Sequence, residues 1–395
     1  MSFFTSELAQ SASTPRSSMQ VDYTEEENTL FALKNLKQIC EMNNASLLRI
    51  ALDTLMDQLS RLNSTNSSDE YAPWAVDLVL LVLSWLPIQY RYIALVASLE
   101  DLETSRNQGQ DKSISTPKQE LMLCIIEGIL TKGESLIGLN VIDVLNTLIN
   151  KIAIQLTLKP TTQTDVVQKL VNCIIGLSIH TYYTEQHKDI SSAIMEWARP
   201  LYQTFLPSSG KITPANESDD EQVLDIKIAA IWSLRALKGV LEQGGGSIPL
   251  DELWAGTEGA LAGKESELRI SYVDALIAHI RADVADGEGH DDESVAKFLS
   301  MIYVSVFMAL KRLENSVSDY RVIWVLMVAL VGRFQSKAVV KGLPMMWRLL
   351  DVVGQKLSRE RRACVDGIFL GYLAVIAEMF KIDSLKEVVS KVPFQ

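Results

Sequence analysis

The four histidines and four cysteines are the residues that could bind a metal or act as nucleophiles. A zinc site requires ligands at short, paired spacings, such as Cys-x-x-Cys or His-Glu-x-x-His. The histidines lack such spacings, and His180 and His187 are seven residues apart across an expected turn. The cysteines are widely separated, at Cys40, Cys124, Cys173 and Cys364. We therefore expect no metal site and interpret the cysteines as buried free thiols in a reducing compartment.

Two glycine motifs have some resemblance to those of enzymes. Gly244 to Gly246 are not followed by the Gly-Lys-Ser/Thr of a phosphate-binding P-loop. Residues 176–180 (Gly-Leu-Ser-Ile-His) resemble part of a nucleophile elbow, but His180 replaces the closing glycine and no strand is expected before it. We expect no catalytic residues, no cofactor and no enzymatic activity.

A cluster of basic residues occupies the segment 333–362. It contains eight basic residues against Asp351 and Glu360, a net charge of +6 in a chain whose net charge is -12. Helical spacing predicts that Lys337, Lys341 and Arg348 share one face. A cluster of this kind forms either a solvated outer ridge or a contact for anionic lipid headgroups or an acidic partner. Its members are Arg333, Lys337, Lys341, Arg348, Lys356, Arg359, Arg361 and Arg362.

The overall composition excludes other classes of function. The net charge of -12 repels nucleic acid, so we expect no nucleic-acid partner. The apolar stretch 75–86 contains Asp77 and stops at Pro87, and the stretch 322–331 is only about ten residues long, against the ~20 that a bilayer requires. We therefore expect no transmembrane span.

Apolar residues recur at helical spacing along most of the chain, and no convincing strand pairs are present. Residues 45–62, for example, place leucines and alanines three and four positions apart. Pro117 is expected in the first turn of a helix, where a missing N–H is tolerated. We predict about fifteen helices, paired at a spacing near 40 residues, which is typical of HEAT and armadillo arrays. The predicted fold is all-α: an α-solenoid of armadillo/HEAT-like antiparallel helix pairs forming an elongated rod, with a globular multi-helix domain as the alternative.

The expected domain organisation is one helical array with a disordered N-terminus. Residues 1–24 are predicted to be disordered and residues 25–392 to form the helical-repeat rod. Flexible loops are expected near 103–116, 207–221, 243–249 and 285–293. Two of these loops carry acidic runs, at 217–221 and 290–293, which we interpret as solvated loops or as partner-contacting insertions.

Particular segments resemble the eighty-five-requiring protein three family, known in flies as Rolling blackout. The two better matches are residues 137–148 (Ile-Gly-Leu-Asn-Val-Ile-Asp-Val-Leu-Asn-Thr-Leu) and 179–190 (Ile-His-Thr-Tyr-Tyr-Thr-Glu-Gln-His-Lys-Asp-Ile). Weaker agreement occurs at 32–39 and where Arg361-Arg362 leads towards Gly371-Tyr372-Leu373. The scattered agreement extends from about residue 32 to 380 and is closest to fungal members.

This resemblance implies a non-catalytic scaffold on the cytoplasmic face of the plasma membrane. Members of the family are helical rods that recruit phosphatidylinositol 4-kinase type III alpha through a tetratricopeptide-repeat adaptor, for phosphatidylinositol 4-phosphate synthesis. The family's basic, cysteine-bearing N-terminal segment and its long C-terminal tail are not found in this sequence. We therefore expect the central part of the rod, peripheral at the plasma membrane or cytosolic if the anchoring segment is absent.

Two alternatives remain at this point. Another armadillo/HEAT-type protein-binding adaptor, in trafficking or nuclear transport, would have the same composition and helical pattern. An unrecognised enzyme on a helical fold is the other, and it conflicts with the missing catalytic motifs.

Overall fold

The expected all-α fold is confirmed. The computed structural model describes residues 23–65, 71–104, 114, 116–132, 135–158, 164–181, 184–205, 217–244, 248–286, 292–312, 314–353 and 358–391. These residues form 17 α-helices and one 3-10 helix, and no strand occurs among them. The chain divides into two compact units, Met1–Tyr182 and Tyr183–Gln395.

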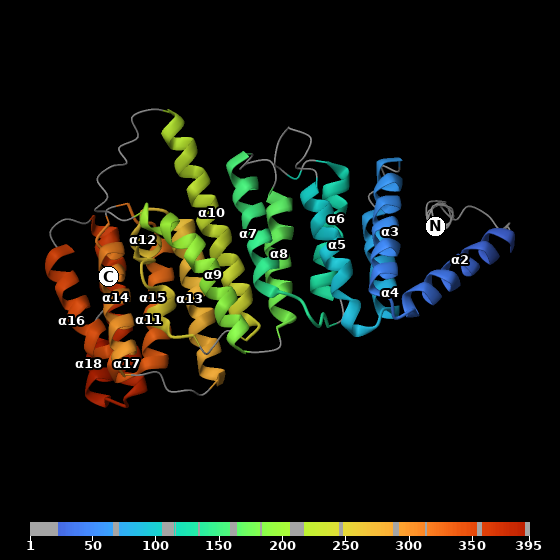
Figure 1. The fold of residues 1–395 in the computed structure, drawn as a ribbon. Helices are drawn as coiled ribbons and strands as arrows, with labels where there is room; N and C mark the ends of the chain where they lie inside the picture. Colours follow the sequence, from blue (N-terminus) through green and yellow to red (C-terminus); the bar gives the residue numbers. More distant parts are fainter. Residues whose placement is uncertain are drawn as a thin grey trace. The chain divides into compact units, whose positions relative to one another are not determined.

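The first unit contains seven α-helices and the 3-10 helix. They are α2 (Tyr23–Glu41), α3 (Ala45–Thr65), α4 (Tyr71–Trp85), η1 (Ile88–Tyr90), α5 (Tyr92–Thr104), α6 (Pro117–Lys132), α7 (Val141–Leu158) and α8 (Thr164–Ile179). Figure 1 shows α3 to α8 standing side by side with their axes roughly aligned.

In the first unit, helices two positions apart in the chain pack directly against each other. The helices α2, α4, α6 and α8 form such a row, each in contact with the next. Glycines bring neighbouring members of this row close together. A Cβ atom on Gly128 of α6 would lie 2.4 Å from a methyl carbon of Val76, and one on Gly176 of α8 would lie 2.9 Å from the backbone of Leu130. Small residues at these positions therefore set the spacing between the helices.

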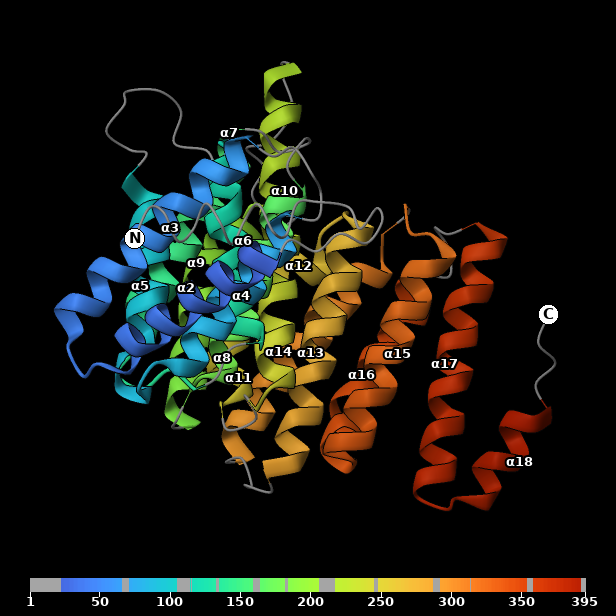
Figure 2. The ribbon, with the colours of Figure 1, turned by 90° about the vertical axis from the view of Figure 1, so that its right-hand side faces the viewer.

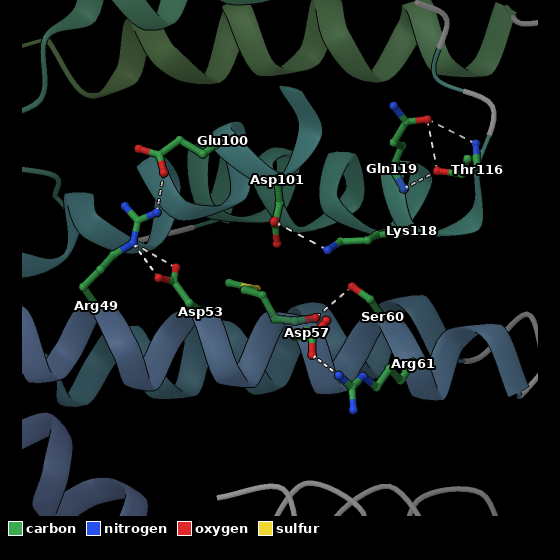
Figure 3. A network of polar contacts seen from close by, with 11 residues as sticks. Arg49, Asp53, Asp57, Ser60, Arg61, Glu100, Asp101, Thr116, Lys118 and Gln119 are labelled. Carbon is green, nitrogen blue, oxygen red and sulfur yellow. Dashed lines mark hydrogen bonds and ion pairs between the residues drawn. The ribbon is translucent and has the colours of Figure 1, made fainter. Parts of the chain in front are cut away.

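The start of α6 shows how local sequence sets a helix boundary. Pro117 is the first residue of α6, as predicted, and its fixed φ suits this position. The Thr116 hydroxyl oxygen accepts a hydrogen bond from the Gln119 backbone N–H at 3.3 Å, and the Gln119 side-chain oxygen accepts one from the Thr116 N–H at 3.2 Å (Figure 3). This reciprocal pair is a capping box, which satisfies backbone donors at the helix start.

Ion pairs on the outside of the first unit connect neighbouring helices. Arg49 of α3 bonds Asp53 on its own helix and Glu100 of α5, while Lys118 of α6 lies 3.5 Å from Asp101 of α5 (Figure 3). The Glu100 side chain is 57% exposed. Exposed pairs of this kind contribute about 0–1 kcal/mol each, so they orient helices more than they stabilise them.

The second unit contains ten α-helices. They are α9 (Thr184–Gln203), α10 (Glu217–Glu242), α11 (Leu250–Trp254), α12 (Glu258–Ala262), α13 (Ser266–Asp286), α14 (Asp292–Leu310), α15 (Val317–Phe334), α16 (Ser336–Val353), α17 (Arg359–Met379) and α18 (Asp383–Lys391).

The helices of the second unit form two rows. One row consists of α10, α13, α15 and α17, and the other of α9, α12, α14 and α16, with each helix in contact with the next in its row. Figure 2 shows α13, α15 and α17 as successive neighbours. The α17 helix also contacts α18, which is the last described helix. Two rows of helices in chain order are the arrangement expected of stacked helix pairs.

Polar contacts also connect helices two positions apart in the chain. In the first unit, His180 contacts Leu130 and Arg49 contacts Glu100, at separations of 50 and 51 residues. In the second unit, Arg269 contacts Asp319 and Lys337 contacts Asp292, at separations of 50 and 45 residues. With the 36 residues between Lys238 of α10 and Asp274 of α13, these separations lie on both sides of the spacing near 40 expected from the sequence.

Parts of the expected loops are helical. The α10 helix begins at Glu217, so the acidic run 217–221 is its first turn and not a loop. The α14 helix begins at Asp292, and its first turn contains Asp292 and Glu293, where the helix dipole favours negative charge. The α2 helix begins at Tyr23, slightly before the expected end of the N-terminal segment. The remaining loop residues (105–113, 115, 206–216, 245–247 and 287–291) and residues 1–22 lie outside the described residues.

One helix is long and apolar enough to cross a membrane. This helix is α14, and half of its most apolar window is buried inside the fold. It packs between α12 and α16 within the second unit. Its buried side chains, among them Phe298, Ile302 and Leu310, lie in the core of that unit.

Candidate interaction surface

The expected basic surface is centred on α16. Ala338, Met346 and Leu349 are buried on its inner side, where α16 contacts α14, α15 and α17. The preceding residue, Gln335, has a φ of 48°, which sharply redirects the chain between α15 and α16. The opposite side of α16 faces outwards, and Pro344 lies on it, where its ring does not interrupt the core contacts.

The three cations expected to share a face of α16 are all exposed. Lys337 forms an ion pair with Asp292, the first residue of α14. The Arg348 guanidinium lies 5.9 Å from the ring centroid of Phe307 on α14, a cation–π geometry. Lys341 has no ion-pair partner among the described residues, so its charge is available to a ligand.

The other basic residues of the cluster are distributed over the neighbouring helices. Arg333 is half-buried at the end of α15, with its guanidinium 5.9 Å from the Phe334 ring. Arg359 and Arg362 are exposed in the first turn of α17, and Arg361 is half-buried. Lys356 lies outside the described residues. The structure therefore unites Lys337, Lys341 and Arg348 on one helix face, and the ligand-binding role of all eight residues stays a prediction.

The outward face of α16 also carries apolar side chains that the sequence analysis did not single out. Val340 and Trp347 are 67% and 58% exposed. The Trp347 ring packs edge-to-face on Phe369 of α17, with ring centroids 5.3 Å apart, so it is held in place. Val304 and Met308 of the neighbouring α14 are exposed as well. The seven-residue spacing of Val340 and Trp347 and the four-residue spacing of Val304 and Met308 are visible in the sequence. Apolar residues at such spacings are usually assigned to a core.

Two of the described histidines, His180 and His279, are buried in the interior of the fold. The His180 ring is buried, and its Nε2 lies 2.9 Å from the Leu130 carbonyl oxygen. Burial lowers the pKa of His180, and the backbone hydrogen bond opposes this only in part. The His279 Nδ1 accepts a hydrogen bond from the Trp254 indole at 2.9 Å. His290 lies outside the described residues, and the described residues contain no group of three or more histidines, cysteines or acidic residues that could hold a metal ion.

The cysteines are free, but only two of the four are buried. Cys40 and Cys173 are buried, as expected, whereas Cys124 and Cys364 are half-buried. The expectation of buried thiols was therefore wrong for two of them.

Residues 176–180 do not form a nucleophile elbow. Ser178 lies within the last turn of α8, and its hydroxyl donates to the Ile175 carbonyl at 2.6 Å. A nucleophile elbow instead requires a strand-to-helix turn. Gly244 has a φ of 140°, a conformation open to glycine, and follows the end of α10.

These features define a helical-repeat protein with an outward basic and apolar surface. The family model described as EFR3 protein matches residues 4–209, which is half of the chain. The chain belongs to the EFR3 family, and the resemblance noted in the sequence is confirmed.

Curated fungal relatives match over most of this chain. It is 23% identical to Protein efr3 of Aspergillus oryzae and 24% identical to Protein EFR3 of Pyricularia oryzae, covering 90% and 93% of the chain. A shorter match, to Protein EFR3 of Yarrowia lipolytica, is 30% identical over 39% of the chain. The chain spans less than two fifths of the length of the first two relatives, 38% and 39%. No solved structure matches the chain.

Proposed function

We propose that this chain is a non-catalytic scaffold segment on the cytoplasmic face of the plasma membrane, where it helps to recruit and organise a phosphatidylinositol 4-kinase complex for phosphatidylinositol 4-phosphate synthesis. Membership of the EFR3 family carries this proposal. The partners are phosphatidylinositol 4-kinase type III alpha and its tetratricopeptide-repeat adaptor. The stacked helix pairs suit the role because they offer a long surface for protein contacts.

The outward face of α16 is the proposed contact with anionic lipid headgroups. Lys341 and Arg348 supply positive charge, which gains about 1 kcal/mol per residue at an anionic membrane surface. Trp347, between them in sequence, supplies an aromatic ring of the type enriched at membrane–water interfaces. Lys337 contributes less, since its charge is already paired with Asp292.

Liposome co-sedimentation tests the lipid contact. Vesicles containing phosphatidylserine should bind the purified chain, and vesicles of phosphatidylcholine alone should not. The double change Lys341→Glu and Arg348→Glu should weaken binding by at least roughly 30-fold, because it removes two favourable charges and adds two that anionic lipid repels. Lys264→Glu is the matched control, because Lys264 is exposed in the turn between α12 and α13. Equal binding by both variants would remove the α16 face from the proposal.

Affinity purification from cells tests the partners. The lipid kinase and its tetratricopeptide-repeat adaptor should co-purify with the chain and be identified by mass spectrometry. Recovery of transport cargo or a nuclear GTPase instead, with no dependence on lipid, would replace the proposal with a transport adaptor.

A further inference from the structure

A polar seam runs along the half-buried edge of the contact between α6 and α8. Gly176 brings the two helices close, since a Cβ atom there would lie 2.9 Å from the Leu130 backbone. On the outer side of this contact, Cys124 and Glu127 of α6 face Lys169 and Asn172 of α8. The four side chains are neither exposed nor buried completely, so small solutes reach them.

Each residue of the seam has a defined partner. The Lys169 Nζ lies 3.0 Å from the Cys124 Sγ, and the Asn172 amide donates to a Glu127 carboxylate oxygen at 2.7 Å. Gln168 donates in turn to the Asn172 side-chain oxygen at 2.8 Å, which fixes the amide in place. The direct hydrogen-bond partner of the lysine is therefore a sulfur atom, although two carboxylates lie nearby.

The surroundings of Lys169 favour its charged form. Burial by itself lowers the pKa of Lys169, but the hydrogen bond to Cys124 and the charges of Cys124, Glu127 and Glu120 raise it overall. This raised pKa keeps Lys169 mainly as an ammonium group, so the amine that peroxide oxidises is the fraction formed when the ammonium releases its proton to solvent.

We propose that peroxide cross-links Cys124 to Lys169 through a covalent S–O–N bridge, which joins α6 to α8. An ammonium group beside a half-exposed cysteine is an environment in which the sulfur reacts with peroxide. A single oxygen atom fits between atoms that are 3.0 Å apart with little movement. A direct S–N bond would require the two side chains to come considerably closer.

The chemistry balances with two molecules of hydrogen peroxide. The sulfur attacks one peroxide oxygen, the O–O bond breaks, and the products are the sulfenic acid and water. The second peroxide oxidises the Lys169 amine to a hydroxylamine, again with release of water. Condensation of the sulfenic acid with the hydroxylamine forms the S–O–N bridge and a third water. Four thiol molecules reverse the reaction, giving the original cysteine and lysine, one water and two disulfides.

Peptide mass spectrometry of the full chain, treated with graded hydrogen peroxide, tests the bridge. The peptides that contain Cys124 and Lys169 should appear joined, with their summed mass increased by one oxygen and decreased by two hydrogens. Dithiothreitol should separate them. The bridge closes a 45-residue segment, so it should also raise Tm by at least about 3 °C, reversibly with thiol.

Lys169→Arg provides the decisive variant, since it keeps the positive charge and cannot form the bridge. It should abolish both the joined peptide and the peroxide-dependent rise in Tm, while circular dichroism shows an unchanged fold. Cys364→Ser is the matched control, because Cys364 is also half-buried, and it should leave the cross-link intact. A disulfide between Cys124 and Cys173 lacks the added oxygen and survives Lys169→Arg. That disulfide, or oxidation of Cys124 only to sulfinic acid, would overturn the proposal.

Discussion

The Arg269 guanidinium and the Asp319 carboxylate form a hydrogen-bonded ion pair in the interior of the second unit. The side chains are 1% and 5% exposed. Arg269 also donates to the Leu261 carbonyl at 3.1 Å and to the Gly263 carbonyl at 2.6 Å. Asp319 in turn forms the capping box of α15 with Ser316. One arginine thus connects the end of α12, the body of α13 and the start of α15.

Arg269→Met should destabilise the second unit by about 3–5 kcal/mol, because it leaves a buried carboxylate without its cation. Denaturant unfolding followed by tryptophan fluorescence measures the change. The double variant Arg269→Met and Asp319→Leu should recover much of the loss, since it removes both charges. Arg49→Met is the control, as its pair with Glu100 is exposed and should cost at most about 1 kcal/mol. Equal losses in the free energy of unfolding for Arg269→Met and Arg49→Met would contradict the larger effect expected for the buried ion pair.

The Asp319 carboxyl should make stability fall in acid. Burial raises its pKa, but hydrogen bonds from Ser266 and Ser316 and the charge of Arg269 outweigh burial and hold the pKa below its ordinary value. A carboxyl whose pKa is depressed by folding stabilises the folded state at pH values above its pKa in the unfolded chain. This stabilisation is lost as the pH falls through its pKa in the folded protein. The free energy of unfolding should therefore drop below about pH 4. Asp319→Asn should be less stable at neutral pH and show a shallower acid slope.

His180 should make the first unit lose stability at a milder pH. Its pKa is lowered by burial, so the neutral ring is favoured in the folded state. As the pH is lowered, His180 is therefore protonated in the unfolded chain at a higher pH than in the folded protein. The free energy of unfolding declines as the pH falls below about 6.5. His180→Gln keeps a donor for the Leu130 carbonyl and should flatten this part of the pH profile, measured by denaturant unfolding. An unchanged slope between about pH 7 and 5 would show that other groups cause it.

Gly176→Ala should destabilise the first unit by about 1–3 kcal/mol, because the added Cβ collides with the Leu130 backbone, which cannot easily move. Gly332→Ala is the matched change, in the last turn of α15. No heavy atom lies within 4 Å of its added Cβ, so it should stabilise the second unit by roughly 0.5–1 kcal/mol. Thermal unfolding of both variants measures the opposite signs, and a loss for both would contradict the open space at Gly332.

Local signals were sufficient for much of the fold. Pro117 and the spacing of apolar residues predicted the start of α6 and the helical character of the chain. The acidic run 217–221 was assigned to a loop because charge runs are commonly solvated, but its residues begin α10. Composition does not distinguish an acidic loop from an acidic first turn of a helix.

The interaction surface was predictable only in part. Helical spacing placed Lys337, Lys341 and Arg348 on one face, because all three lie on the same helix. The exposure of Trp347 depends on how α16 packs against α14 and α17, which no local pattern specifies. The contact between Cys124 and Lys169 joins residues 45 positions apart, so it also depends on the packing of two helices.

The packing of the helices into rows has a mechanical consequence. Within each unit, successive helices of a row contact one another. Tension applied between the ends of a unit would therefore act on each contact between successive helices in turn. Single-molecule stretching should show extension in steps of one helix pair, with a pair joined by a covalent bridge resisting longest.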